Sequence, residues 1–242
     1  MTDRPLIFSG PMVSRLLCEI QEPGTGKTKT RRVLSNDKPG SLFNGTWADS
    51  YVLDPGNQSW RDREVRVVPG DRLWVREAHV LLPPLAYRGS IGTGTIQQRE
   101  HPTDRTMACV YREGFDRSGR PYWRSSRYMH RWASRITLLV TDVHVQRLHD
   151  ITEQDVLAEG LAKVSKDGKL WKFGLPDRDG LPGNDDHGWH WKDWSADPKQ
   201  AFARLWNSLH GDAWGLNPWV AVYTFKPVLR NIDDLEAGAS ND

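Results

Sequence analysis

Residues 136–148 constrain the fold more strongly than any other part of the sequence. They are rich in isoleucine, leucine and valine, and this concentration of β-branched and aliphatic side chains favours an extended strand. Ile136, Leu138 and Val140 recur at the two-residue spacing that places side chains on one face of a strand. We therefore expect one long, bent strand here and a β-sheet at the centre of the protein.

Other hydrophobic patterns predict shorter strands and helices on both sides of this segment. Strands are expected at residues 6–8, 73–77, 107–111 and 219–225, with a further strand or hairpin at residues 122–124. Helices are expected at residues 11–20, 152–160 and 198–210. Strands of mixed spacing with two or three helices indicate an α+β protein, built as a small β-barrel with flanking helices and long loop insertions.

The 242 residues show neither an internal repeat nor a linker that would separate domains. We expect a single domain over residues 1–230. Stretches rich in glycine, proline, asparagine and aspartate have no sustained period and are expected to be loop insertions. These insertions cover about residues 34–66, 80–128 and 165–193, and an acidic, flexible tail is expected at residues 231–242.

The charge balance does not identify a partner by itself. The chain has 33 lysine and arginine residues against 31 aspartate and glutamate residues, so a case for nucleic acid must rest on local clusters. Cys18 and Cys109 lie among apolar neighbours and are expected to be reduced. No apolar run approaches the roughly 20 residues of a membrane span. We expect a cytoplasmic protein that does not contact a membrane.

The 12 tryptophans either anchor a small core or offer flat rings on which bases stack. Those in predicted strands or helices, where a core position is expected, are Trp74, Trp206 and Trp219. Those that crowd a predicted loop are Trp189, Trp191 and Trp194. The role of the loop tryptophans stays open at this point.

The glycine-rich segment at residues 23–28 resembles the phosphate-binding loop of ATPases. In such a loop, backbone amides surround the phosphates and the lysine contacts the β- and γ-phosphates. Three features disagree: Gln21 replaces the first glycine, a helix pattern precedes the segment, and Pro39 interrupts any helix after it. A P-loop ATPase is therefore only a remote alternative.

The same glycine-rich segment continues into a basic run. Together, Gly26-Lys27-Thr28-Lys29-Thr30-Arg31-Arg32 resembles the signature of the ASCH family, in which a glycine and lysine precede Thr-x-Arg. Residues 70–77 resemble that family's Gly-Asp-x-Leu strand, residues 136–148 its long strand, and residues 219–226 its closing strand. The resemblance is greatest to the larger ASCH proteins of bacteriophages and prophages. It implies a PUA-like β-barrel that binds a nucleobase or RNA, in the host cytoplasm if a phage encodes it.

A bacterial branch of the ASCH superfamily hydrolyses N4-acetylcytidine, and its site residues correspond to Lys27, Thr30, Arg32 and Glu159. Thr30 would be the nucleophile, Lys27 and Glu159 would move the proton, and Arg32 or a backbone amide would stabilise the oxyanion. Thr30 and Arg32 share a face of an extended strand, whereas Lys27 joins them only if residues 27–30 turn. Two features depart from that branch: the chain is about twice as long, and Arg31 replaces an apolar residue.

The same segment allows a protein that binds RNA without catalysis. The side chains that would then form a solvated basic edge against phosphates are Lys27, Lys29, Arg31 and Arg32. Glu159 would be an exposed helix residue that pairs with Lys163 four positions later. Catalysis and binding alone both remain open.

Two residues near the Gly-Asp-x-Leu strand are secondary candidates for substrate binding. They are Trp74 and Glu77, and the alternative for Glu77 is a salt bridge with Arg72 or Arg76. Arg72 or Arg76 is also expected to extend the basic patch. We expect RNA or a modified nucleoside as the partner, and the sequence leaves the oligomeric state open.

The tryptophan-rich loop contains a cluster of possible metal ligands. The cluster consists of Asp185, Asp186, His187 and His190. Its loop has too little regular structure to fix ligand geometry. We therefore expect neither a metal nor another cofactor.

Overall fold

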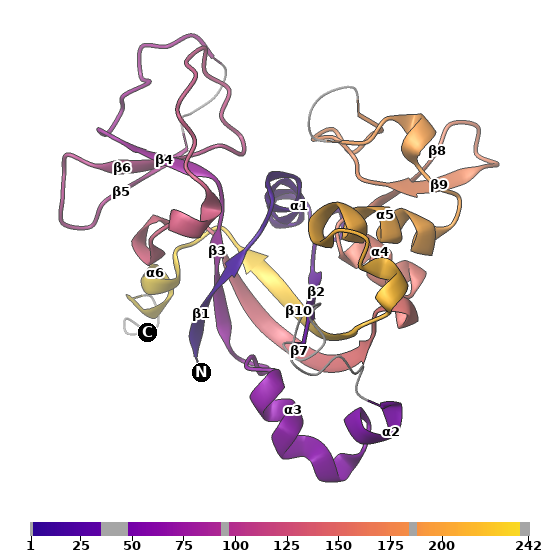
Figure 1. Cartoon of the computed structure of the whole chain (residues 1–242). Coiled ribbons are helices and arrows are strands. Elements are labelled where there is room, and N and C mark those ends of the chain that lie inside the picture. The colour runs from indigo at the N-terminus through magenta and orange to yellow at the C-terminus, as the bar shows by residue number, and fades with distance from the viewer. Residues whose placement is uncertain (1, 35–47, 93–96, 184–187, 238–242) are drawn as a thin grey trace. The chain divides into compact units, whose positions relative to one another are not determined.

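The computed structural model describes residues 2–34, 48–92, 97–183 and 188–237. Its largest sheet has five strands in the order β1-β3-β7-β10-β2 (Figure 1). Their bounds are Asp3–Ile7 (β1), Lys29–Val33 (β2), Arg72–Arg76 (β3), Thr137–Arg147 (β7) and Trp219–Val228 (β10). β1 runs parallel to β3, whereas β3 and β7, like β10 and β2, are antiparallel, so the sheet is mixed. The protein is of the α+β class, and the predicted long strand is β7.

The chain divides into two compact units. The first consists of Met1–Gly24, Asp71–Leu139 and Lys226–Asp242, and the second of Thr25–Gly70 and Val140–Phe225. β7 and β10 each contribute residues to both units. Among the described residues, no helix has the length and apolar character needed to cross a membrane.

The first unit adds helices and a small antiparallel sheet to its share of the large sheet. Its helical elements are α1 (Gly10–Gln21), η3 (Ser126–Tyr128), η4 (Arg131–Ala133) and α6 (Ile232–Ala237). The small sheet has the order β4-β6-β5, with bounds His79–Leu82 (β4), Gln98–Glu100 (β5) and Ala108–Tyr111 (β6). α1 buries Met12, Val13 and Leu16 on one face, which explains the periodic pattern that predicts this helix.

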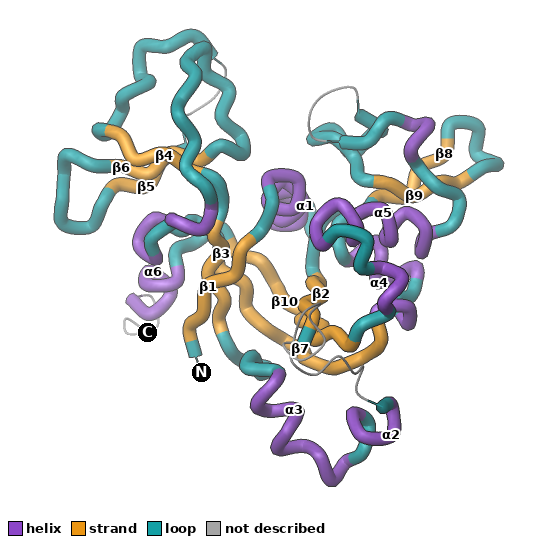
Figure 2. The backbone as a smooth tube through the Cα atoms, in the orientation of Figure 1, coloured by secondary structure: helices purple, strands orange, loops and turns teal. Residues whose placement is uncertain are grey.

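The second unit contains most of the remaining helices and a hairpin (Figure 2). Before β3 lie α2 (Asp49–Val52), η2 (Pro55–Asn57) and α3 (Gln58–Glu64). After β7 lie η5 (Leu148–Asp150), α4 (Glu153–Ala158), η6 (Trp191–Asp193), α5 (Pro198–His210) and η7 (Trp214–Leu216). The hairpin consists of β8 (Ala162–Ser165) and β9 (Trp171–Gly174).

The sequence determines the ends of α4 and α5 through local capping. At α4, the Thr152 side chain accepts a hydrogen bond from the Asp155 amide and the Asp155 side chain accepts one from the Thr152 amide, a complete capping box. α5 begins after Asp197, whose side chain accepts from the Lys199 amide, and ends at Gly211, where φ is +69°. These caps fix where each helix begins and where α5 ends.

Several segments predicted to be loops contain regular structure. The stretch at residues 34–66 includes α2 and α3, residues 80–128 include β5 and most of β4, and residues 165–193 include β9. β5 is a short run of polar residues that becomes a strand by pairing with β6. No isolated strand forms at residues 122–124, where Arg124 makes a single bridge to His79. These elements depend on partners distant in sequence, so local periodicity does not reveal them.

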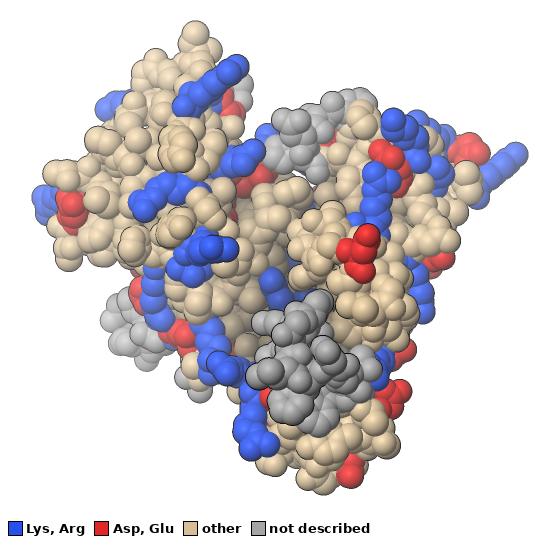
Figure 3. All heavy atoms as spheres, viewed as in Figure 1, with Lys and Arg blue, Asp and Glu red and all other residues tan. Residues whose placement is uncertain are grey.

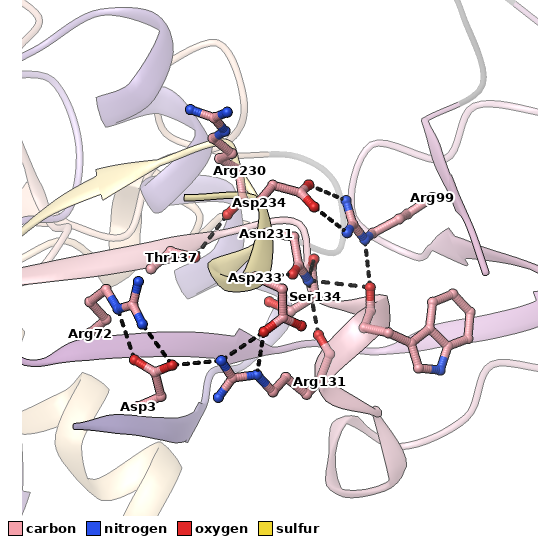
Figure 4. Close-up of polar contacts among 11 residues, drawn as sticks. Asp3, Arg72, Arg99, Arg131, Ser134, Thr137, Arg230, Asn231, Asp233 and Asp234 are labelled. Carbon is pink, nitrogen blue, oxygen red and sulfur yellow. Dashed lines mark hydrogen bonds and ion pairs between the residues drawn. The ribbon is translucent and has the colours of Figure 1, made fainter. Parts of the chain in front are cut away.

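The beginning of the predicted flexible tail is ordered by polar contacts within the first unit (Figure 4). Asn231 is buried and donates from Nδ2 to the carbonyls of Arg131, Trp132 and Ser134. Arg131 donates to Asp3 over 2.5 Å and to Asp233 over 2.7 Å. These hydrogen bonds and ion pairs attach the start of α6 to the rest of this unit.

The core contains the three tryptophans predicted to lie there. Trp74, Trp206 and Trp219 are all buried. Cys109 is also buried and both cysteines are free, as the sequence predicts. Trp194, which was expected in a loop, is buried as well, and its ring lies against Gly174 of β9.

Candidate functional site

The candidate site lies in the second unit, where the chain around β2 meets α4. The turn before β2 is held by two backbone hydrogen bonds: the Thr28 amide donates to the Ala158 carbonyl, and the Phe225 amide donates to the Thr28 carbonyl. The first of these bonds satisfies a carbonyl that the end of α4 would otherwise leave unpaired. This turn directs Lys27 toward the C-terminal end of α4.

Lys27 and Glu159 form a buried ion pair although they are 132 residues apart in the sequence. The Lys27 Nζ atom lies 2.6 Å from Glu159 Oε2 and donates a second hydrogen bond, of 2.7 Å, to the Glu159 carbonyl oxygen. The two residues are only 2% and 4% exposed. Lys27 thus neutralises the Glu159 carboxylate and also caps the C-terminal end of α4.

Arg31 joins the same carboxylate to a second one. Its guanidinium lies 3.0 Å from Glu159 Oε1 and 3.0 Å from Asp155 Oδ2. Lys29 Nζ lies 2.6 Å from the other oxygen of Asp155. The resulting network contains three cations and two carboxylates and links β2 to one face of α4.

Burial determines the protonation behaviour of this network. It lowers the pKa of Lys27 below the usual lysine value, and the charge of Glu159 opposes only part of this effect. For Asp155, burial alone would raise the pKa, but hydrogen bonds from Lys29 and Thr152 and the charge of Arg31 together lower it to about 2. Lys27 therefore releases its proton more readily than an exposed lysine does.

Thr30 and Arg32 lie on the face of β2 opposite to Lys29 and Arg31, because strand side chains alternate. Thr30 is paired in register with Tyr223 of β10, and Arg32 with Ala221. Burial lowers the pKa of Arg32, while the charge of Glu159 raises it in part. Arg32 also acts electrostatically on Lys27. Thr30 and Arg32 thus share a face, as expected for an extended segment.

Two interpretations of the basic segment are wrong. Lys27 and Arg31 are buried and paired with carboxylates, so the segment is not a solvated edge. Glu159 does not pair with Lys163, whose ammonium group instead lies 2.7 Å from Glu153. The reason in both cases is that α4 presents its carboxylates to β2.

The local structure does not provide the helix that a P-loop requires. In a P-loop, the lysine is followed by a helix whose N-terminus faces the phosphates. Here the residues after Thr28 form β2, and the Lys27 ammonium group is committed to Glu159. The phosphate-binding alternative therefore has no support in the geometry of this segment.

The secondary candidates lie in the first unit, where other partners hold them. Glu77 is buried and accepts two hydrogen bonds from Arg135, of 2.9 and 2.8 Å, so its partner is neither Arg72 nor Arg76. Arg72 pairs instead with Asp3. Trp74 is buried, and the guanidinium of Arg76 lies 5.2 Å from its ring centroid. These contacts place Glu77 and Trp74 in the packing of their own unit.

The cluster of possible metal ligands lies mostly outside the described residues, which include neither Asp185 nor Asp186 nor His187. His190 is described and precedes η6. Within the described ranges, no group of three or more histidine, cysteine, aspartate or glutamate side chains could hold a metal ion.

The sequence does not identify Asp155 as a residue of the site, and it does not reveal that Arg31 contacts carboxylates. Asp155 was recognised only as an acidic residue at a helix start, and Arg31 only as a phosphate ligand. The signal that identifies Asp155 is its spacing from Glu159, because residues four apart lie on one face of a helix.

Comparison of the chain with protein-family models, with curated proteins and with solved structures found no match in any of the three.

Proposed function

We propose that the chain is a nucleobase- or RNA-interacting protein of the ASCH type that hydrolyses an acyl amide on a modified nucleoside such as N4-acetylcytidine. The observation that carries this proposal is the buried pair of Lys27 and Glu159, with 2.6 Å between Nζ and Oε2. A buried lysine whose pKa is lowered gives up its proton more readily than an exposed lysine does, and an acid–base catalyst must release and regain a proton. The proposal includes the finer fold, a PUA-like β-barrel, and a cytoplasmic location.

Thr30 is the proposed nucleophile. Its Oγ attacks the acyl carbon, and its proton passes to the Lys27–Glu159 pair when the lysine is the neutral amine. The pair then protonates the exocyclic nitrogen as the C–N bond breaks, which releases the nucleoside and leaves an ester on Thr30. Water attacks this ester, and its proton returns through the pair to Thr30 as the free acid departs.

Arg32 is the proposed electrostatic partner of the reacting carbonyl. It shares a strand face with Thr30, and a guanidinium donates hydrogen bonds to a developing oxyanion. The charge of the network around Glu159 supports the same role, because its three cations share only two carboxylates. The surplus positive charge favours a substrate oxygen that becomes negative during the reaction.

A binding protein without catalysis is the second candidate, and burial favours it. Lys27 and Thr30 are only 2% and 4% exposed, so a substrate reaches them only after neighbouring side chains move. In this alternative the ion network fixes β2 to α4, and RNA binds without being cleaved. The P-loop ATPase gains no comparable support.

The deciding experiment is to incubate the protein with N4-acetylcytidine and measure acetate and cytidine by chromatography. Lys27→Arg keeps the positive charge but does not release a proton, so we expect a rate loss of about 100-fold or more. Thr30→Val, which removes only the hydroxyl, should lose a similar factor. Thr30→Ser keeps a hydroxyl and serves as the control that retains activity.

Either of two results would reject the hydrolase. One is no acid release by the folded wild type from a panel of acylated nucleosides. The other is wild-type turnover by Lys27→Arg, confirmed as folded by circular dichroism. If the wild type binds single-stranded RNA in the same preparations, the binding protein is the better account.

A further inference from the structure

Two lysines of the β8–β9 hairpin lie over one tryptophan ring of η6. The Lys166 and Lys172 ammonium groups lie 4.9 and 5.0 Å from the centroid of the same Trp191 ring. We call these three residues the lysine–tryptophan surface. Lys166 is exposed, and Lys172 and Trp191 are half-buried, so all three remain accessible to a ligand.

This surface is a built feature of the hairpin. Gly174 of β9 has no side chain, and a Cβ atom there would lie 2.4 Å from the Trp194 ring. The Trp194 ring therefore lies directly on the hairpin, and its Nε1 donates to the Trp189 carbonyl over 2.9 Å. Trp191 packs beside it, with 6.0 Å between the ring centroids. A fixed indole of this kind loses little conformational entropy when a ligand stacks on it.

The charge around this surface is unbalanced. Among the described residues, no carboxylate forms an ion pair with Lys166 or Lys172. The nearest carboxylate in the sequence, Asp167, accepts hydrogen bonds from the Ser165 hydroxyl and from two backbone amides of the hairpin turn. In Figure 3, lysine and arginine side chains gather over the part of the second unit where β8 and β9 lie, with acidic side chains between them. The two ammonium groups thus remain available for an anion.

We propose that the lysine–tryptophan surface binds single-stranded nucleic acid: the Lys166 and Lys172 ammonium groups move from the Trp191 ring onto phosphates, and a base takes their place on the ring face. Both ammonium groups lie about 5 Å from one ring, so they are close enough for adjacent groups of one strand. An acidic peptide could bind the two ammonium groups, but its carboxylates offer no flat ring to stack on the Trp191 indole. Unpaired bases offer both the charge and the flat ring, whereas a duplex hides its base faces.

The experiment measures fluorescence anisotropy with a labelled 15-nucleotide oligouridylate and the full chain at several salt concentrations. Lys166→Ala/Lys172→Ala should weaken binding about tenfold or more at low salt. The same change should reduce the slope of log affinity against log salt by about 1.4, the contribution of two phosphate contacts in a single strand. The matched control is Lys226→Ala/Arg230→Ala, which removes two exposed cations of the first unit and should leave binding at this surface unchanged.

A second variant separates stacking from charge. Trp191→Leu should weaken binding at every salt concentration without changing the slope, while Trp191→Phe should retain most of the affinity. The proposal is overturned if the wild type does not bind the oligonucleotide or binds duplex RNA equally well. It is also overturned if the lysine double variant, folded by circular dichroism, binds like the wild type.

This inference does not depend on the proposed hydrolase. Lys166 and Lys172 take no part in the network around Glu159, so free N4-acetylcytidine should be hydrolysed at an unchanged rate in the lysine double variant. Loss of oligonucleotide binding with hydrolysis intact supports the surface. Hydrolysis that is absent in the wild type, with oligonucleotide binding present, rejects the hydrolase alone.

Discussion

Replacing Glu159 by glutamine tests how much the fold depends on the buried network. The substitution keeps the size of the side chain but removes the charge that faces Lys27 and one of the two carboxylates that face Arg31. Lys27 would then be a buried ammonium group without its partner, since it is 2% exposed in the folded protein. Removing one member of a buried ion pair destabilises a protein by about 3–5 kcal/mol. We expect a loss of that size at pH 7.

The loss should shrink as the pH rises, and this dependence identifies Lys27 as the cause. Burial already lowers the pKa of Lys27, and without Glu159 that pKa falls further. Above this pKa the folded variant holds a neutral amine while its unfolded chain still binds the proton. Stability relative to the wild type therefore recovers by up to about 1.4 kcal/mol per pH unit, between the pKa of Lys27 in the variant and its higher pKa in the wild type.

Urea unfolding followed by circular dichroism at pH 7, 8 and 9 measures this effect. Glu153→Gln is the matched control on the same helix, because Glu153 pairs with Lys163 over 2.7 Å but its side chain is 47% exposed. Exposed pairs contribute about 0–1 kcal/mol, so the control should lose little stability and show no such trend. A loss below about 1 kcal/mol for Glu159→Gln, or one that does not change with pH, would refute the reasoning.

Two substitutions and one labelling experiment probe the packing within the two units. Gly174→Ala places a Cβ atom 2.4 Å from the Trp194 ring and should cost about 1–3 kcal/mol in urea unfolding. Arg135→Met leaves the buried Glu77 carboxylate without its two hydrogen bonds and should destabilise the protein by about 3–5 kcal/mol in the same assay. Burial raises the pKa of Cys109 to about 12, so at pH 8 its thiol should resist alkylation until urea unfolds the protein, as peptide mass spectrometry would show.

The elements that the sequence predicts well are those with a local cause. β7 follows from a run of β-branched residues, α1 from its apolar stripe, and α4 and α5 from their capping residues. The elements that it misses depend on distant partners. β5 consists of Gln98, Arg99 and Glu100 and has no apolar alternation, yet it pairs with β6. A pattern within the segment cannot reveal an interaction made by another segment.

The candidate site was predicted in part for the same reason. The resemblance in sequence brought Lys27 and Glu159 together, and the structure places them in contact. It did not identify the contacts of Arg31, because the assignment of a basic side chain to phosphates or to carboxylates depends on what lies opposite. Here Asp155 and Glu159 lie opposite Arg31, and no feature within the basic segment indicates that two carboxylates are its partners.

The sequence nevertheless contains the spacing from which this contact follows. The capping box at Thr152 fixes the start of α4 and hence the direction in which Asp155 points. Four residues of helix advance by about 6 Å, so Asp155 and Glu159 form two steps on one face. Two residues of strand advance by about 6.6 Å, nearly the same distance. Because these repeats match, Lys29 and Arg31 lie opposite Asp155 and Glu159, and the Arg31 guanidinium contacts both carboxylates at 3.0 Å. The turn before β2 brings Lys27 to the other oxygen of Glu159.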